Sequence, residues 1–331
     1  MRCTSRNLKK RIISMLLSAG LIIGVCGCGN TSYELPYDAN SAVSGFNVVA
    51  EGKPDVADAF AVNLCISEHD VTDTAFADTE NTGSAILFDV NNAEVLYSEN
   101  AHEKLSPASL TKVLTALVAL KHSTPDTMLT ATEAVYVNES GAQLCGLKAG
   151  DTMTLNQALH IALLNSANDA ALLIAENVGG SVEEFVAMMN EEARLLGATN
   201  SNFVNPHGLT ETEQYTTAYD LYLIFNEAIK QEKFVEIIQM SSYETTYYNG
   251  AGEPQQISVR NTNKYVNGDV SVPDNVTVIG GKTGTTNAAG HCLMVLSKDT
   301  NGAPYVSVIL KAASRDRLYA QMTDLLDEIG K

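Results

Sequence analysis

The chain has 331 residues, of which 45% are hydrophobic and 18% are charged, a balance typical of a globular protein that buries a sizeable core. Its formal net charge at pH 7 is −18. Nucleic acid and anionic membrane surfaces repel such an acidic chain, which argues against both as partners.

The first 27 residues have the layout of an export signal. The basic stretch MRCTSRNLKKR precedes the apolar run IISMLLSAGLIIGV, which is shorter than the roughly twenty residues of a transmembrane helix. Gly27 and Cys28 then resemble the lipobox of bacterial lipoproteins, in which the cysteine is lipidated. Cys26 is an uncommon lipobox residue, so plain secretion and an uncleaved anchor stay open. We expect a signal peptide at 1–27 and a lipid-anchored protein on the outer face of a bacterial cell membrane.

Residues 28–82 are rich in Asn, Ser, Thr, Asp and Ala and show little periodicity. This composition indicates a tether of low order that carries a folded domain at 83–331. The apolar run FAVNLCI at 60–66 is a candidate strand within it. Beyond the export segment, the three remaining cysteines are scattered, with no CxxC motif or Cys/His cluster of metal-site spacing. We therefore expect no metal and no other cofactor.

The folded part has β-rich runs at both ends and helical patterns between them. The predicted elements are a hairpin with strands at 84–90 and 94–100, helices from Ser106 and at 154–164, 169–177 and 181–197, a second hairpin at 291–298 and 304–312, and a helix at 314–330. This order predicts an α+β fold: one antiparallel sheet formed from both ends of the domain and flanked by helices, with a helical subdomain.

The stretch SPASLTK holds a serine and a lysine three residues apart. If Ser106 caps a helix and Pro107 takes its first position, Ser109 lies in the first turn and Lys112 lies beside it on the same face. A buried lysine whose pKa is depressed can act as the base that activates a serine hydroxyl. About one S-x-x-K match is expected by chance in a chain of this length, so a solvated hydroxyl and a surface cation remain the alternative.

Two further motifs place polar groups where apolar patterns break. In NSAND (165–169), Ser166 and Asn168 interrupt a helical pattern, and their alternative role is to cap the helix that follows. In GGKTGTT (280–286), glycines let a substrate backbone approach a strand edge, while Lys282 and Thr283 offer a cation and a hydroxyl to a carboxylate. The alternative there is an ordinary glycine-rich turn.

The three motifs in this order resemble the serine D-Ala-D-Ala carboxypeptidases, the low-molecular-mass penicillin-binding proteins. The segments that carry the resemblance are PASLTK at 107–112, LLNSANDAALLIAE at 163–176, NPHGL at 205–209, QYTTAYDL at 214–221 and GGKTGTTNAAGHCLM at 280–294. The resemblance covers about residues 83–330. It implies a β-lactamase/transpeptidase-like fold and a substrate in the peptidoglycan stem peptide.

The resemblance also implies a role for each motif residue. Ser109 is acylated by the penultimate D-Ala carbonyl with release of the terminal D-Ala, and Lys112 is the base for acylation. Ser166 and Asn168 relay a proton and orient the substrate amide. Water then hydrolyses the acyl-enzyme, and β-lactams act as slow suicide analogues.

On the same grounds, the third motif binds the substrate's end. Lys282 and Thr283 hold the terminal carboxylate, Gly284 leaves room for the substrate backbone, and the N–H groups of Ser109 and Thr285 form the oxyanion hole. Arg317 matches a family arginine near the carboxylate site, although the alignment slips easily to Arg315. The middle motif reads S-A-N where family members often have S-G-N, so an extra methyl group crowds that loop.

Three other functions stay open beside the carboxypeptidase. A DD-endopeptidase of the same family differs only in its substrate. A class A-type β-lactamase needs a glutamate to activate the deacylating water, and no E-x-x-L-N run lies between 177 and 280. A non-catalytic lipoprotein that binds wall peptide has no use for a Ser–Lys pair.

Overall fold

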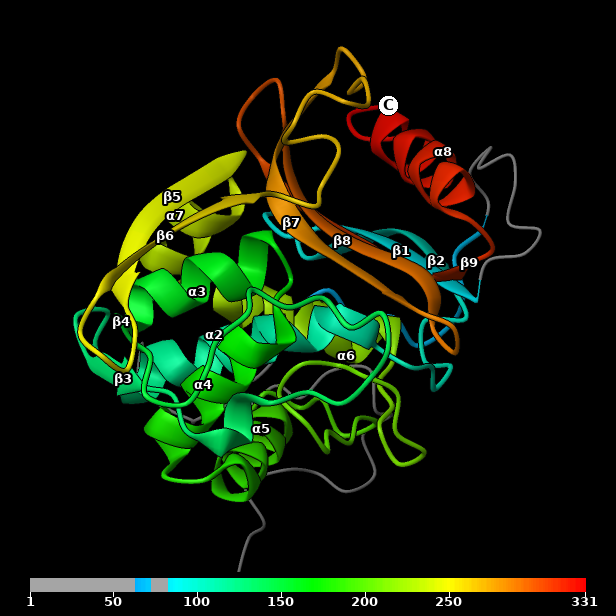
Figure 1. Cartoon of the computed structure of the whole chain (residues 1–331). Helices are drawn as coiled ribbons and strands as arrows, with labels where there is room; N and C mark the ends of the chain where they lie inside the picture. The colour runs from blue at the N-terminus through cyan, green and yellow to red at the C-terminus, as the bar shows by residue number, and fades with distance from the viewer. Residues whose placement is uncertain (1–62, 73–82) are drawn as a thin grey trace, which may run out of the picture. The chain divides into compact units, whose positions relative to one another are not determined.

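Two hairpins from opposite ends of the domain share one sheet in the computed structural model, which describes residues 63–72 and 83–331 (Figure 1). The strands are β1 (Ser84–Asp89), β2 (Glu94–Glu99), β7 (Val276–Thr286), β8 (Gly290–Asp299) and β9 (Pro304–Ala312). Their order is β2-β1-β9-β8-β7, and every pairing is antiparallel. The predicted α+β fold is confirmed, and the sheet joins both ends of the domain because β1 pairs with β9.

Both faces of this sheet are covered, since alternate side chains of a strand point to opposite faces. Ile86 and Phe88 of β1 belong to the core shared with the central helices, whereas Leu87 belongs to a second core with Met322 of α8 (Arg315–Asp327). Figure 1 shows α8 lying along one face and the helical subdomain on the other. Strand β1 is buried along its whole length as a result.

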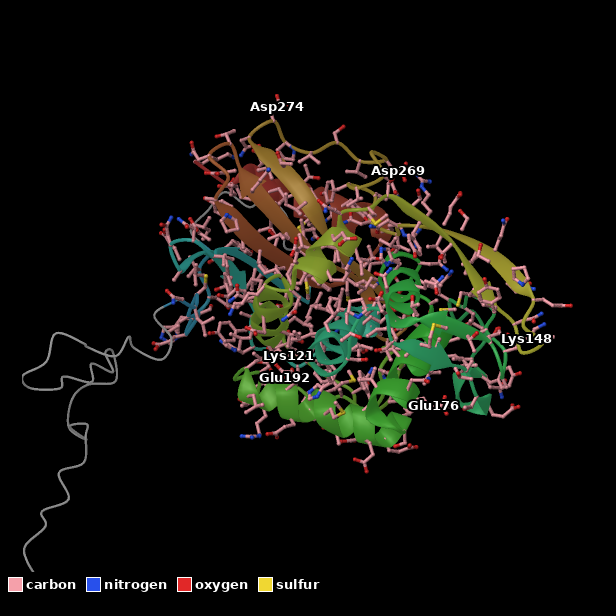
Figure 2. The ribbon with its side chains drawn as sticks, turned by 90° about the vertical axis from the view of Figure 1, so that its left-hand side faces the viewer. Lys121, Lys148, Glu176, Glu192, Asp269 and Asp274 are labelled. Carbon is pink, nitrogen blue, oxygen red and sulfur yellow. The ribbon has the colours of Figure 1, made fainter. Side chains whose placement is uncertain are left out.

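The helical subdomain surrounds one central helix. Its members are α2 (Thr111–His122), α3 (Leu155–Leu164), α4 (Asn168–Gly179), α5 (Val182–Leu195), α6 (Ala218–Ala228) and α7 (Glu232–Ile238). Residues 111–119 of α2 are all buried, because α3, α4, α5 and α6 pack around it. At the far end of α2, Lys121 turns toward Glu192 of α5 and pairs with it at 2.7 Å (Figure 2). A lysine near the start of this helix is therefore enclosed, whereas one near its end is partly exposed to solvent.

The structure contains a second sheet that the sequence analysis does not predict. Its four strands are β3 (Met128–Thr130), β4 (Thr152–Thr154), β5 (Ser242–Tyr248) and β6 (Pro254–Arg260), in the order β3-β4-β5-β6. The long hairpin β5–β6 alternates between exposed and half-buried residues and buries almost no apolar side chain. Its polar composition, SYETTYY and PQQISVR, lacks the apolar runs by which the other strands were predicted.

The described part of the expected tether packs on the domain. The N–H of Cys65 donates to the Tyr222 hydroxyl at 3.0 Å, and Val71 pairs with Ser98 of β2. The candidate strand at 60–66 is wrong for residues 63–66, which form no strand, and residues 60–62 lie outside the described residues. The predicted signal peptide at 1–27 and the rest of the tether also lie outside them. In the parts that the structure describes, no helix has the length and apolarity to span a bilayer.

Candidate active site

Ser109 lies in a strained turn that leads into α2. This turn is the 3₁₀ helix η1 (Ala108–Leu110), and Ala108 has φ +46°, a left-handed conformation that costs a non-glycine residue about 1–2 kcal/mol. The predicted cap by Ser106 is wrong: Pro107 takes the cap position, and no side chain caps the turn. Ser109 therefore precedes the α-helix that was expected to contain it.

Two glycines allow other segments to close on this turn. A Cβ atom at Gly208 would lie 1.8 Å from the carbonyl oxygen of Ala108, so only glycine fits there, and its φ of +91° also favours glycine. A Cβ atom at Gly284 of β7 would lie 3.0 Å from the backbone nitrogen of Ser109. The NPHGL loop and β7 thus pack backbone to backbone against the serine.

Lys112 holds the centre of the site. Its Nζ contacts Ser109 Oγ at 3.0 Å, Asn168 Oδ1 at 2.7 Å and the carbonyl oxygen of His207 at 2.6 Å. The side chain is 1% exposed. Burial, with the Lys282 charge beside it, lowers the pKa of Lys112 well below its ordinary value, against an opposing contribution from Asp169.

When Lys112 is uncharged, this coordination orients its amine. An uncharged lysine carries two N–H bonds and one lone pair. The Asn168 and His207 oxygens can only accept, so they take the two N–H bonds and leave the lone pair facing the Ser109 hydroxyl. The arrangement is that of a general base beside a nucleophile.

The NSAND motif breaks the helix as predicted, but neither polar side chain caps the next one. Helix α3 ends before Asn165, and α4 begins at Asn168 with Ala167 at its cap position and no side-chain cap bond. The Asn168 amide oxygen instead accepts from Lys112. Ser166 adopts φ +63° in the connection and accepts a hydrogen bond from Lys282 Nζ at 3.0 Å. The helix-cap alternative is therefore wrong for both residues.

Lys282 is the second enclosed lysine of the site. It lies in β7, the edge strand of the five-stranded sheet, and also donates to the carbonyl oxygen of Thr283 at 2.9 Å. Its side chain is 1% exposed, and burial lowers its pKa to about 7. An edge strand has unpaired backbone groups, so β7 can pair with an extended peptide, as the GGKTG motif predicts.

A cleft of about 760 Å³ is lined by hydrogen-bond partners of the two lysines rather than by the lysines themselves. Its lining includes Ser109, Ser166 and Asn168 from the first two motifs, Thr283–Ala288 of β7 and its turn, and residues 139–143 from the segment before β4. Of the two candidate arginines, Arg315 lines the cleft and Arg317 does not. Arg315 lies near His291, and burial together with the Arg315 charge lowers the pKa of His291.

Residues 71–314 match the family model described as D-alanyl-D-alanine carboxypeptidase, which spans most of the described domain. The chain belongs to this family. The D-alanyl-D-alanine carboxypeptidase DacF of Bacillus subtilis is 33% identical over 248 residues, which cover 74% of this chain and 61% of that protein. A D-alanyl-D-alanine endopeptidase of Pseudomonas aeruginosa is 30% identical over 74% of this chain and 76% of its own length.

The family fold is also seen in solved structures. The Streptomyces K15 DD-transpeptidase is similar with a TM-score of 0.69 and 25% identity, over 75% of this chain and 96% of that one. The chain spans about three-fifths of the length of the first curated carboxypeptidases that it matches. Residues 71–314, which match the family model, contain all three motifs.

Sequence reasoning missed two contributors to this carboxypeptidase-family site. One is the backbone of NPHGL, which supplies the His207 carbonyl to Lys112. Burial and the Lys112 charge lower the pKa of the His207 side chain to about 3. Asn205 fixes that loop by accepting from the N–H of Gly208 at 2.7 Å. The other is Asp169, whose carboxylate binds the segment before β4. Their signal was the polar residues of the two motifs NPHGL and NSAND.

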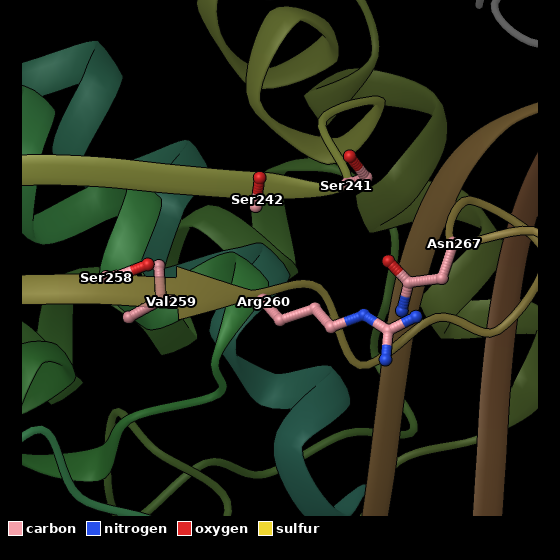
Figure 3. Close-up of a pocket in the computed structure, with 6 residues that line it drawn as sticks. All are labelled: Ser241, Ser242, Ser258, Val259, Arg260 and Asn267. Atoms are coloured by element: carbon pink, nitrogen blue, oxygen red, sulfur yellow. The ribbon is translucent and has the colours of Figure 1, made fainter.

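A second cavity, of about 460 Å³, lies between the β5–β6 hairpin and the loop after it (Figure 3). Its lining residues are Ser241, Ser242, Ser258, Val259, Arg260 and Asn267. Arg260, its charged member, is paired with Asp269 at 2.9 Å. Among the residues that the structure describes, no group of three or more His, Cys, Asp or Glu side chains is placed to hold a metal ion.

Proposed function

We propose that the protein is a serine DD-carboxypeptidase that removes the terminal D-Ala from peptidoglycan stem pentapeptides through an acyl-enzyme. The observation that carries the proposal is the buried Lys112, whose Nζ lies 3.0 Å from Ser109 Oγ and is oriented by two fixed acceptors. Membership of the carboxypeptidase family supports the same reaction.

Acylation begins at Ser109. Lys112 accepts the hydroxyl proton while Oγ attacks the carbonyl carbon of the penultimate D-Ala, forming a C–O bond and a tetrahedral oxyanion. The N–H groups of Ser109 and Thr285 are the proposed donors to that oxyanion. When the intermediate collapses, the C–N bond breaks, and the leaving amine of the terminal D-Ala takes up the proton that Lys112 accepted, relayed through Ser166, which leaves Lys112 neutral again.

The terminal carboxylate binds at the other end of the cleft. Lys282 supplies a positive charge, and Thr283 supplies a hydroxyl beside it. Arg315 supplies a further cation in place of Arg317, because it lines the cleft. The substrate backbone lies along the open edge of β7, over Gly284.

Deacylation returns the enzyme to its starting state. Water attacks the ester carbonyl and its proton passes to Lys112. The C–O bond to Ser109 then breaks, Lys112 returns that proton to Ser109 Oγ, and the shortened peptide is released. A β-lactam presents a similar carbonyl beside a carboxylate, but its leaving nitrogen stays tethered in the acyl-enzyme. The absence of an E-x-x-L-N run between 177 and 280 supports slow hydrolysis of that adduct and disfavours a β-lactamase.

The proposed test uses covalent labelling and product release together. The purified protein is incubated with a fluorescent penicillin and, separately, with a pentapeptide that ends in D-Ala-D-Ala. We expect a covalent adduct and free D-Ala, both lost in Ser109→Ala and both retained in Ser258→Ala, a serine of the second cavity. No adduct and no D-Ala with the unaltered protein would contradict the catalytic proposal, and rapid penicillin turnover without D-Ala release would favour a β-lactamase.

A DD-endopeptidase remains the second candidate, because a relative of that name is 30% identical over 74% of the chain. It would cleave cross-linked dimers at the D-Ala carbonyl, whereas a carboxypeptidase prefers the free pentapeptide. Parallel kinetics on both substrates separate the two activities.

We also propose that the enzyme acts outside the cell membrane, attached through a lipid on Cys28 after removal of residues 1–27. Residues 28–82 would then link the lipid to the catalytic domain at 83–331. We expect Cys28→Ala to abolish lipid labelling and membrane recovery and Cys26→Ala to leave both intact. Membrane recovery of both variants without lipid would indicate an uncleaved anchor instead.

A further inference from the structure

The motif residue Asp169 has no role in the steps above, although it lies next to Asn168. Its side chain is 2% exposed. Both carboxylate oxygens accept hydrogen bonds from the segment before β4: Cys145 N–H at 3.0 Å, Gly146 N–H at 2.8 Å and Leu147 N–H at 3.1 Å. A carboxylate has about four lone-pair sites, and the N–H of Ala170 occupies another at 3.0 Å.

The same segment forms one side of the cleft. Residues 139–143, here called the cleft wall, line it together with residues 283–286 of β7. None of residues 136–146 is buried, and the flanking core side chains are Val135 and Leu147. Between those two residues only the half-buried Cys145 packs against the core, so the position of the wall depends largely on hydrogen bonds.

The NSAND motif supplies those bonds. Besides the Asp169 carboxylate, the N–H of Asn168 donates to the Gln143 carbonyl at 2.8 Å, and the Gln143 amide donates to Asn165 Oδ1 at 3.1 Å. Asn168 thus holds Lys112 with its side chain and the wall with its backbone. One short motif fixes both the base and the opposite side of the substrate's path.

We propose that Asp169 is a positioning residue that holds the cleft wall at the distance from β7 that the stem peptide requires. This inference rests on the proposed function. Asp169 touches neither Ser109 nor Lys112 within hydrogen-bond distance, and its charge is the smallest of the causes that set the pKa of Lys112, so its loss affects how the peptide is held more than how the serine is activated. The peptide would lie as an extended chain between the wall and β7.

The variant Asp169→Asn tests this role, because it replaces one acceptor oxygen by an NH₂ group that faces backbone N–H donors. For a pentapeptide that ends in D-Ala-D-Ala, we expect KM to rise about tenfold and kcat to stay within about threefold. The matched control is Asp89→Asn, a buried carboxylate that accepts from the N–H groups of Asn91 and Asn92 in the β1–β2 turn. It should leave KM unchanged.

A second readout follows the wall directly. The Cys145 thiol donates to Asp169 Oδ1 at 3.3 Å, and burial together with the Asp169 charge raises its pKa. Release of the wall should therefore speed alkylation of Cys145 by iodoacetamide about tenfold, measured by peptide mass mapping. If Asp169→Asn does not fold, Asn165→Ala removes one wall contact from the surface and should move both readouts in the same direction by a smaller factor.

The outcomes separate this inference from the proposed function. Unchanged KM and unchanged Cys145 alkylation in a folded Asp169→Asn would overturn it, as would a loss confined to kcat. If the unaltered protein released no D-Ala, the proposed function would fail. The rates of Cys145 alkylation in Asp169→Asn and in its control Asp89→Asn would still decide whether Asp169 holds the wall.

Discussion

The site contains two enclosed lysines whose surroundings differ in one respect. Lys112 and Lys282 are each 1% exposed, and burial lowers the pKa of both. Lys112 faces two oxygens that can only accept, besides the nucleophile, whereas Lys282 faces the Ser166 hydroxyl and one carbonyl of its own strand. The two fixed acceptors around Lys112 occupy its N–H bonds and aim its lone pair at the Ser109 hydroxyl. Lys282 has one fixed acceptor, so it keeps an N–H bond that can be donated to an anion.

Replacing each lysine with arginine in a separate variant tests this comparison, and the largest effect is expected at Lys112. Arginine keeps the positive charge but cannot act as a base at accessible pH. We expect Lys112→Arg to lower the acylation rate about 10³-fold or more, and Lys112→Ala to do the same in a folded protein. Acylation by a fluorescent penicillin measures it, with circular dichroism as the check on folding. Normal acylation of Lys112→Ala would mean that another group is the base.

Lys282→Arg should have a smaller effect of a different kind. The cation that faces the carboxylate remains, so we expect KM for the pentapeptide to rise about tenfold while kcat changes little. Lys282→Met removes the charge and should raise KM further. Equal kcat losses in Lys282→Arg and Lys112→Arg would show that the two lysines do not have separate roles.

The pH dependence of kcat/KM sharpens the same distinction. Lys112 must be neutral, so acylation is present above its lowered pKa and is lost as pH falls through it. Lys282 must be charged to bind the carboxylate, and in the free enzyme its pKa is about 7, so peptide affinity weakens as pH rises through that value. We expect a bell-shaped profile whose alkaline limb is lost for a neutral amide substrate that lacks the carboxylate. A profile with the same alkaline limb for both substrates would contradict the role of Lys282.

How much of this could be predicted from sequence depends on whether the signal is local. The two hairpins of the five-stranded sheet and the helix breaks were predictable because alternation and turn residues are short-range patterns. The motif order pointed to Ser109, Lys112, Ser166, Asn168 and Lys282, which the structure links by hydrogen bonds in two groups, Ser109–Lys112–Asn168 and Lys282–Ser166. The partner of Lys112 in NPHGL was not predictable, because a backbone carbonyl carries no residue signature and lies 95 residues away. Ser106 failed as a cap because the chain forms the turn η1 before α2, with Pro107 at its cap position, and the glycines that pack on this turn, Gly208 and Gly284, come from distant parts of the sequence.

The smallest expected effect concerns Lys121, a third lysine, which lies at the opposite end of α2. It pairs with Glu192 at 2.7 Å and with Glu227 at 3.4 Å. These carboxylates raise its pKa although its partial burial opposes them, so it stays charged and has no free lone pair. We expect Lys121→Met to lower the free energy of unfolding by about 1 kcal/mol and to leave acylation unchanged, as measured by urea unfolding and penicillin labelling. Since Lys112 and Lys121 share one helix, a loss of acylation in Lys121→Met would mean that the helix itself, rather than the oxygens around Lys112, governs the base.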